Sequence, residues 1–417
     1  MKKYLALILA LCMLLALAAC GEPSEPSGSS EPPVESGEPV SEEPVEAELD
    51  IMMSFPQFMD QWETYCKQFE EKMLAEENIK LTINLEMPSS GDYESVLQTR
   101  LTGDDAPDLF TLHSNNIATY YEAGHLADLS GEELAGKIYP DVAAMVTYDG
   151  KLLGVPIESQ AWGPLYNKAI FEEAGVAAVP TTWAELDAAC QKIKDAGYTP
   201  ITCDDAYILC LFGYHMSRLN GYDKTSDIVK NNKWDDPSVM ETAKAYADFA
   251  QKGYFSENIA SNVFPAGQNQ ELALGTAAMY LNGSWLPNEV KNMAGDDFQW
   301  GCFSYPAVEG GKDGTEAANY GGQVLAINKN SQHAEDAFKL ITYITKGEFD
   351  KKLSEESLGI PSDTTNSEWP VQLTDVKPVM ESLKTRYPWA AGAEDNVDMT
   401  PIIKENMTKL CSGAITA

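Results

Sequence analysis

From residue 49 onward, short apolar segments alternate with amphipathic helical segments, and this alternation limits the fold more than any other feature. Residues 49–53, 79–85 and 107–112 have the composition of strands, and residues 58–77 and 92–101 have that of helices. In the first of these helices, large apolar side chains recur every three or four positions, at Phe58, Trp62, Tyr65, Phe69 and Met73. Such alternation predicts an α/β fold with a largely parallel sheet covered on both faces.

Three short motifs predict where individual elements begin or turn. Thr182 is followed three residues later by Glu185, the spacing of a capping box at a helix N-terminus. The pair Asp236-Pro237 predicts a second helix start, since proline at the first helical position loses no hydrogen bond. The pair Asp149-Gly150 predicts a tight hairpin turn.

The N-terminus has the features of an export signal. Two lysines precede the uncharged, Leu/Ala-rich run 4–19, which is shorter than the roughly 20 residues that a membrane-spanning helix needs. The run ends in Leu-Ala-Ala-Cys-Gly, which resembles a bacterial lipobox with Cys20 as the modified residue. We therefore expect a signal peptide at 1–19 and a lipid anchor on Cys20. The alternative is a plain secretory signal.

The segment after the cysteine is predicted to be a disordered tether. Residues 21–48 contain nine Glu, six Pro and six Ser, with no aromatic or basic residue. Such a composition cannot bury enough apolar surface to offset the loss of chain entropy. We assign 20–48 to the lipidated cysteine and an acidic tether, a type of segment that suits the surface of a Gram-positive cell.

Charge and composition exclude several classes of function. With 29 Lys+Arg against 64 Asp+Glu, the formal net charge of -35 argues against a nucleic-acid partner. Only four histidines are present, so no His-rich metal site is expected. Six cysteines remain after the signal and Cys20, and in a core of this size we expect buried free thiols rather than disulfides. A length of 417 residues fits two or three lobes.

Two neighbouring motifs carry a resemblance to a known family. Residues 149–156 read Asp-Gly-Lys-Leu-Leu-Gly-Val-Pro, and residues 165–175 read Leu-Tyr-Asn-Lys-Ala-Ile-Phe-Glu-Glu-Ala-Gly. Further matches follow in family order at 103–108, 180–183, 275–285, 321–322 and 358–361. The chain resembles the family 1 extracellular solute-binding proteins, the maltose-binding-protein-like receptor lipoproteins of ABC importers. At Pro164 the chain departs from the family pattern, which usually has another apolar residue at that position. Departures of this kind leave the identity of the ligand undetermined.

The resemblance implies a two-lobed periplasmic-binding-protein-like fold of type II, with a ligand cleft between lobes that crossover hinge segments join. Its motifs place the crossovers near 157–163, 302–306 and 358–361. Lobe one would comprise 49–160 with 303–357, and lobe two 161–302 with 358–417. Such a receptor is a monomer that closes on its ligand and delivers it to the membrane permease of the importer, without catalytic residues or a cofactor.

A carbohydrate ligand requires aromatic platforms beside polar side chains, because a sugar has flat C–H faces and hydroxyl groups that donate and accept. Most candidate residues follow the end of a predicted strand or lie in the first crossover. The candidates are Trp285, Gln160, Trp162, His113, Asn115, Gln57, Asp204, Asp205, Tyr207 and Trp389.

Seven of the ten candidates have a purely structural alternative. Trp285 and Trp162 could pack within a lobe, His113, Asn115 and Gln57 could lie in surface loops, and either Asp204 or Asp205 could cap the following helix. Three other tryptophans lie on helix faces or beside capping motifs and are predicted to be core, namely Trp62, Trp183 and Trp300.

Other functions fit less well. A secreted carbohydrate-active enzyme could use two of the many carboxylates, but the chain has no GxSxG, HExxH, Walker or GxGxxG motif. An iron receptor could use Tyr120 and Tyr121, although a helix ending at Gly124 predicts that at least one ring is core. Polyamine and peptide ligands also remain open. The sequence predicts a lipid-anchored, extracytoplasmic carbohydrate receptor.

Overall fold

The computed structural model describes residues 43–54, 59–89, 92–136, 138, 140–295, 298–375, 377–381 and 383–417. Cys20, Gln57 and Phe58, the signal peptide predicted at 1–19 and the predicted tether up to residue 42 lie outside the described residues.

Nine strands of the described residues form one sheet, in which the main path runs β2-β1-β3-β10-β6-β8-β7. Strand β11 pairs with β10, and β9 pairs with β6. The strands are β1 (Val45–Met52), β2 (Ile79–Glu86), β3 (Leu109–His113), β6 (Val155–Asn167), β7 (Thr199–Thr202), β8 (Ala277–Gly283), β9 (Trp300–Cys302), β10 (Ala317–Ile327) and β11 (Thr385–Tyr387).

Two long central strands make the sheet continuous. β10 is antiparallel to both β3 and β6, and β6 is antiparallel to β8 and β9. The outer pairs β1–β2, β1–β3 and β7–β8 are parallel. The prediction of a largely parallel sheet therefore holds for the flanks and is wrong for the centre. There, the predicted first crossover at 157–163 is not a separate segment, because it forms part of the unbroken strand β6.

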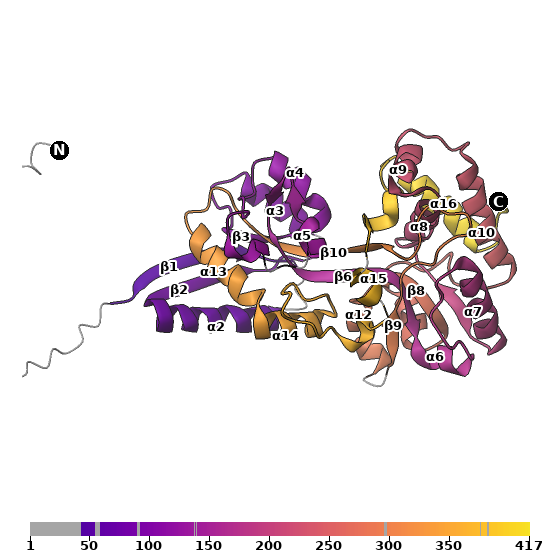
Figure 1. Ribbon diagram of the computed structural model, residues 1–417, viewed down its shortest axis with the longest axis horizontal. Helices are drawn as coiled ribbons and strands as arrows, with labels where there is room; N and C mark the ends of the chain where they lie inside the picture. Colours follow the sequence, from indigo (N-terminus) through magenta and orange to yellow (C-terminus); the bar gives the residue numbers. More distant parts are fainter. Residues whose placement is uncertain are drawn as a thin grey trace, which may run out of the picture. The chain divides into compact units, whose positions relative to one another are not determined.

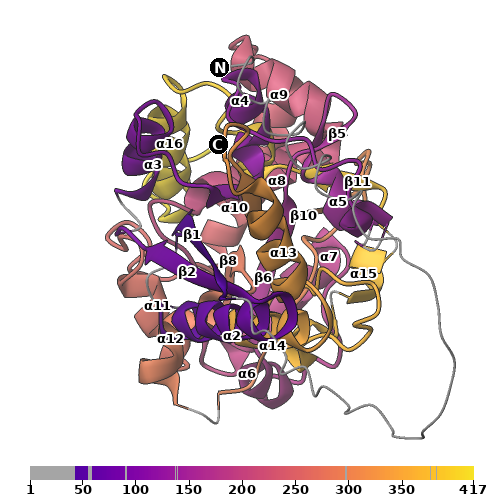
Figure 2. The same ribbon diagram turned by 90° about the vertical axis from the view of Figure 1, so that its left-hand side faces the viewer.

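Helices cover both faces of the sheet, as Figures 1 and 2 show for β1 and β2, with α2 and α14 on one side and α3 and α4 on the other. The helices of the first half are α2 (Met59–Glu77), α3 (Tyr93–Leu101), α4 (Ile117–Glu122), α5 (Pro140–Ala144), α6 (Lys168–Glu173) and α7 (Trp183–Asp195). Those of the second half are α8 (Ile208–Asn220), α9 (Tyr222–Lys230), α10 (Pro237–Gln251), α11 (Gly267–Ala273), α12 (Leu286–Ala294), α13 (Ala334–Ile344), α14 (Gly347–Ser357), α15 (Lys377–Glu381) and α16 (Thr400–Cys411). The described residues also contain four short 3-10 segments: η2 (Ser114–Asn116), η3 (Glu133–Gly136), η4 (Val371–Leu373) and η5 (Trp389–Gly392).

The local motifs form the predicted structures. The Thr182 hydroxyl accepts from Glu185 N at 3.2 Å, and a Glu185 carboxylate oxygen accepts from Thr182 N at 3.1 Å, so the capping box is complete. Asp236 caps α10 with proline at its first position. Asp149 and Gly150 have φ angles of 51° and 72° between β4 (Thr147–Tyr148) and β5 (Lys151–Leu152), as a primed hairpin turn requires.

The buried apolar residues form two separate cores. The first core surrounds β1–β3 and ends on β6 at Ala161, and the second begins on β6 at Trp162 and surrounds β7 and β8. Trp62 and Trp300 are 1% and 6% exposed, and Trp183 packs against the second core, so all three are core residues as predicted. The six cysteines are buried free thiols: Cys66, Cys190, Cys203, Cys210, Cys302 and Cys411.

The cores divide the chain differently from the predicted lobes at three places. Strand β1 starts at Val45, so residues 45–48, which we assigned to the tether, belong to the sheet. Residues 303–305 and Ala317, assigned to lobe one, lie in the second core, and the chain crosses within β10. Residues 360–380, assigned to lobe two, contribute Ile360, Leu373 and Met380 to the first core. Sequence motifs mark local turns, whereas the crossing points depend on which core each side chain fills.

Candidate functional site

Four of the ten predicted side chains meet in one cluster. The Trp162 ring centroid lies 4.5 Å from that of Trp285, 6.1 Å from that of Tyr207 and 6.4 Å from that of Trp389. Tyr207 and Trp389 are themselves 6.2 Å apart, with their planes at 75°. We call Trp162, Tyr207, Trp285 and Trp389 the aromatic cluster. Its members come from four separate parts of the chain.

Sheet register brings the two closest members together. Trp162 of β6 pairs with Gly283 of β8, and Trp285 follows at the start of α12. A Cβ atom on Gly283 would lie 1.6 Å from the Trp285 ring, so the indole occupies the space that any other residue at 283 would fill. Trp162 is 9% exposed, and its Nε1 is buried without a hydrogen-bond partner among the described residues. A buried donor without a partner is uncommon in folded proteins and calls for an explanation.

A carboxylate that the sequence did not single out holds the Trp285 indole. Trp285 Nε1 donates to Glu289 Oε1 at 3.1 Å, and Asn269 Nδ2 donates to Glu289 Oε2 at 3.0 Å. Burial raises the pKa of Glu289. The sequence did contain a signal for this contact: residues 285 and 289 are four apart at the start of a helix, so their side chains lie on the same face.

The two predicted aspartates both accept hydrogen bonds within the protein. Asp204 is 1% exposed; Oδ1 accepts from Ala206 N at 2.7 Å and Tyr207 N at 2.8 Å, and Oδ2 accepts from the Tyr280 hydroxyl. These bonds fix the turn that presents Tyr207, which supports the capping alternative for Asp204. Asp205 is exposed, and its Oδ1 accepts from Phe264 N at 2.9 Å.

Gln160 is also engaged within the protein. It is 6% exposed, and its Oε1 accepts from Ser284 Oγ at 2.5 Å while its Nε2 donates to the Ser357 carbonyl at 3.2 Å. Both ends of the amide are therefore occupied. Gln160 thus links the turn before α12 to the end of α14. Although it is only two residues before Trp162, it does not belong to the aromatic cluster.

His113 belongs to a second, polar group. It ends β3, pairs with Gln323 of β10, and its Nδ1 accepts from Asn115 N at 3.3 Å. Burial, together with Arg386 nearby, lowers the pKa of His113 to about 4, so the imidazole is neutral at pH 7. The side chain of Asn115 is exposed.

Two further hydrogen bonds join the other members of this group in pairs. Ser54, directly after β1, donates to Gln323 Oε1 at 3.2 Å, and Arg386 Nη2 donates to Ser114 Oγ at 3.3 Å. We call Ser54, His113, Ser114, Gln323 and Arg386 the polar group. The sequence analysis found only His113 of these five, because the others are brought together by strands far apart in the chain. Polar residues past the carboxyl ends of β1 and β3 are in the usual place for ligand contacts in α/β sheets.

The two groups are separated along β10. Trp162 pairs with Asn319 of β10, and His113 pairs with Gln323, four residues further along the same strand. At about 3.3 Å per residue the two positions are roughly 13 Å apart. The structure thus brings four predicted residues together, places His113 in the polar group with the exposed Asn115 next to it, and shows internal hydrogen bonds for Gln160, Asp204 and Asp205.

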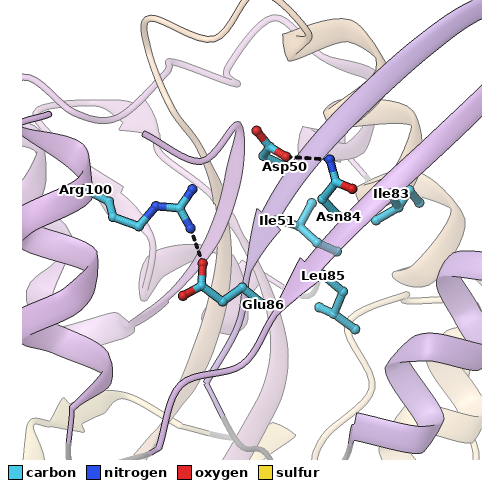
Figure 3. A pocket seen from close by; sticks show the side chains of 7 residues that line it. All are labelled: Asp50, Ile51, Ile83, Asn84, Leu85, Glu86 and Arg100. Carbon is cyan, nitrogen blue, oxygen red and sulfur yellow. Dashed lines mark hydrogen bonds and ion pairs between the residues drawn. The ribbon is translucent and has the colours of Figure 1, made fainter. Parts of the chain in front are cut away.

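Two hollows in the described surface lie away from both groups. One, of about 480 Å³, lies at the edge of the sheet between β1, β2 and Arg100. In Figure 3 its polar side chains pair with each other: Arg100 forms an ion pair with Glu86, and Asn84 donates to Asp50 at 2.8 Å. The other, of about 320 Å³, is apolar and lies between α8, α10, α16 and the last residues. Neither is lined by a predicted site residue.

The described residues offer little to a metal ion. Among them, no group of three or more His, Cys, Asp or Glu side chains is arranged to hold one. Tyr120 is 3% exposed and donates to Glu94 Oε1 at 2.6 Å, so its ring is core as predicted.

Comparison with known proteins identifies the family. A sequence profile described as bacterial extracellular solute-binding protein matches residues 54–348, well over half of the chain. The chain belongs to this family. The resemblance drawn from the motifs at 149–156 and 165–175 is therefore confirmed.

Relatives of this solute-binding protein include two that are named as sugar-binding proteins. The multiple sugar-binding protein of Streptococcus mutans is 27% identical over 273 residues, which cover 63% of this chain and 64% of that protein. The maltotriose-binding protein of Pyrococcus abyssi is 27% identical over 287 residues, covering 65% of this chain and 58% of that one.

Solved structures confirm the two-lobed fold. The sugar-binding protein MalE of Xanthomonas citri matches with a TM-score of 0.69 at 18% identity, over 89% of this chain and 93% of that one. The GacH receptor of Streptomyces glaucescens matches with a TM-score of 0.67 at 19% identity, over 89% and 94%. At these identities the likeness establishes the predicted α/β, periplasmic-binding-protein-like fold. No helix within the described ranges is long and apolar enough to cross a membrane.

Proposed function

We propose that this solute-binding protein is the receptor of an ABC importer and captures a mono- or oligosaccharide, which it delivers to the membrane permease subunits. The observation that carries the proposal is the aromatic cluster, in which three indoles and a phenol from four parts of the chain meet beside a buried, unpartnered donor, Trp162 Nε1. Indole faces bind the C–H surfaces of sugars, and a sugar hydroxyl is an acceptor for the indole N–H.

The polar group supports a ligand longer than one sugar ring. His113 and Ser114 lie at the end of β3, a strand of the first core, whereas the members of the aromatic cluster belong to the second core or pack against it. A ligand that contacted both would bridge the roughly 13 Å between them along β10. Because such a ligand would contact both lobes only when they close, its binding energy would favour the closed form.

A binding role without catalysis or a cofactor agrees with the state of the carboxylates. Hydrolysis of a glycosidic bond needs two carboxyl groups facing the substrate. Near the aromatic cluster, Asp204 is saturated by internal hydrogen bonds, and both oxygens of Glu289 accept from Trp285 and Asn269. The named relatives are likewise binding proteins.

Attachment to the cell membrane forms part of the proposal. The apolar run 4–19 and the following cysteine support a lipoprotein signal, with Cys20 as the lipid-bearing residue and the acidic segment after it as a tether. The mature receptor would be a monomer outside the cytoplasm, on the membrane of a Gram-positive bacterium. Labelling with radioactive palmitate should mark the wild type and fail for Cys20→Ser; equal labelling of both would refute the anchor.

Calorimetric titration of the purified receptor tests the ligand class. Maltotriose, stachyose and a chitin trisaccharide are the sugar probes, and spermidine, a tripeptide and ferric citrate are the rivals. We expect binding of at least one sugar, and a melting temperature that rises as ligand is added, since a ligand at 100 times its Kd adds about 2.7 kcal/mol to stability. Binding of spermidine, peptide or iron with no response to any sugar would overturn the assignment, as would turnover of a bound sugar.

A further inference from the structure

The turn that carries Trp389 has an unusual backbone. Ala390, Ala391 and Gly392 all have positive φ angles, of 52°, 47° and 90°. Residues with a Cβ atom rarely adopt this left-handed conformation, because the Cβ atom approaches the following carbonyl oxygen. Two successive alanines there, both fully buried, must be held by their surroundings. The turn begins directly after the indole that faces Trp162 and Tyr207.

Helix α8 supplies the contacts that hold the turn. A Cβ atom at Gly213 would lie 1.7 Å from the Ala390 carbonyl oxygen, so glycine is the residue that lets this carbonyl enter the helix surface. One helical turn later, Ser217 Oγ donates to the Ala391 carbonyl at 2.9 Å. Positions 213 and 217 are four apart and share one face of the helix. Both stabilising contacts therefore act on the two strained alanines.

The same helix also carries Tyr207 at its N-terminus. The Trp389 ring centroid lies 6.2 Å from that of Tyr207 and 6.4 Å from that of Trp162. Trp389 itself is only partly buried. Its place therefore depends on the turn behind it, and α8 sets the separation between Trp389 and Tyr207.

We propose that Gly213 and Ser217 are positioning residues that hold the left-handed turn 390–392 and so fix the Trp389 indole as one wall of the ligand site. This inference rests on the proposed function, because the Trp389 indole is a wall of the ligand site only if the aromatic cluster binds the ligand. The placement of the indole can be measured without any ligand, which separates failure of this inference from failure of the proposed function.

The first experiment follows Trp389 itself. In protein labelled with 5-fluorotryptophan, the Trp389 resonance is assigned by its loss in Trp389→Phe. Gly213→Ala and Ser217→Ala should shift or broaden this resonance and leave those of the core residues Trp62 and Trp300 in place. An unchanged Trp389 resonance in both variants overturns the proposal whether or not a sugar binds.

The second experiment compares affinity with stability, using the sugar probe that binds the wild type. Ser217→Ala should weaken binding about fivefold, the loss expected when one hydrogen bond no longer holds the turn. Ser238→Ala is the matched control, because that buried hydroxyl donates to Asp236 at 2.6 Å and none of its bonds reaches residues 389–392. Equal weakening by both variants would mean a general structural effect and would overturn the proposal.

A third variant separates positioning from folding if Gly213→Ala does not fold. Ala391→Gly relieves the left-handed strain, so the melting temperature of the free protein should not fall. The relaxed turn no longer holds the indole in one place, and sugar affinity should drop severalfold. If the turn mattered only for folding, Ala391→Gly would keep both the wild-type melting temperature and the wild-type sugar affinity. That result would contradict the inference.

Discussion

The indoles of Trp162 and Trp285 meet edge to face, with ring centroids 4.5 Å apart and planes at 72°. Their contact follows from the pairing of Trp162 with Gly283, two residues before Trp285, and from the absence of a side chain at Gly283. Edge-to-face aromatic pairs contribute about 0.5–1.5 kcal/mol beyond the area they bury. This pair therefore supports the lobe around the second core and also forms part of the candidate ligand site.

Removing the Trp285 ring should abolish sugar binding at a moderate cost in stability. Because this indole is only partly buried, we expect Trp285→Ala to lower the free energy of unfolding by about 1–2 kcal/mol, less than the 3–5 kcal/mol typical of a fully buried tryptophan. Trp234→Ala is the control, since Trp234 also packs partly buried against the second core but lies outside the aromatic cluster. Calorimetry and urea unfolding of both variants measure the two effects. If both lose binding alike, Trp285 has no special role.

Two histidines with lowered pKa values, the buried His215 and the partly buried His113, should make the protein sensitive to acid. Burial lowers the pKa of His215 to about 3, and burial with Arg386 nearby lowers that of His113 to about 4, against about 6.5 in an unfolded chain. The unfolded state thus binds more protons, so the stabilisation is complete above pH 6.5 and is lost as pH falls from 6.5 towards 4. The slope should approach about 1.4 kcal/mol per pH unit for each histidine. Urea unfolding between pH 4 and 7 should show a shallower slope for His215→Phe; an unchanged slope would refute the assignment.

Glu394 should act in the opposite direction. Burial, with the charge of Asp395 beside it and a smaller opposing effect of Lys404, raises the pKa of Glu394 to about 7. Since the folded state holds the proton more tightly than the unfolded chain, its contribution to stability is greatest below pH 4.5 and is lost as pH rises to 7. Glu394→Gln should therefore stabilise the protein by on the order of 1–3 kcal/mol at pH 8 and have little effect at pH 4.5. Chemical denaturation at both pH values measures this, and equal effects at the two would contradict it.

The fully buried Arg218 should be essential for the segment that leads into β10. Its Nη2 donates to the Tyr305 carbonyl at 2.6 Å, and its Nε donates to the same carbonyl at 3.1 Å and to that of Pro306 at 3.3 Å. Arg218→Met keeps most of the volume but leaves both carbonyl oxygens without these donors. We expect a loss of about 2–6 kcal/mol, because each of the two buried carbonyl oxygens left without a donor costs about 1–3 kcal/mol. A urea midpoint within error of the wild type would show that water replaces the guanidinium.

Local sequence signals predicted the elements and their ends well, because each depends on residues close together in the chain. The capping box at Thr182, the proline at the start of α10 and the Asp149-Gly150 turn all formed as expected. Helical spacing placed Trp62 in the first core.

The site was predicted only in part. Aromatic side chains after strand ends pointed to Trp162, Tyr207, Trp285 and Trp389, and these four converge. Gln160 and Asp204 have the same chemistry as ligand-binding residues, yet their polar atoms are used internally. A sequence names the donors and acceptors but not their partners, which are decided by the packing.

By itself the sequence determined that alternating strands and helices form an α/β protein, and which residue types could receive a sugar, because periodicity and side-chain chemistry are local properties. Only the tertiary structure decided that β6 and β10 run unbroken from one core to the other and that residues 360–380 return to the first core. It also decided that the strained turn 390–392, which packs against α8, places Trp389 beside Trp162. These outcomes depend on contacts between residues hundreds of positions apart, whose free energies no local pattern encodes.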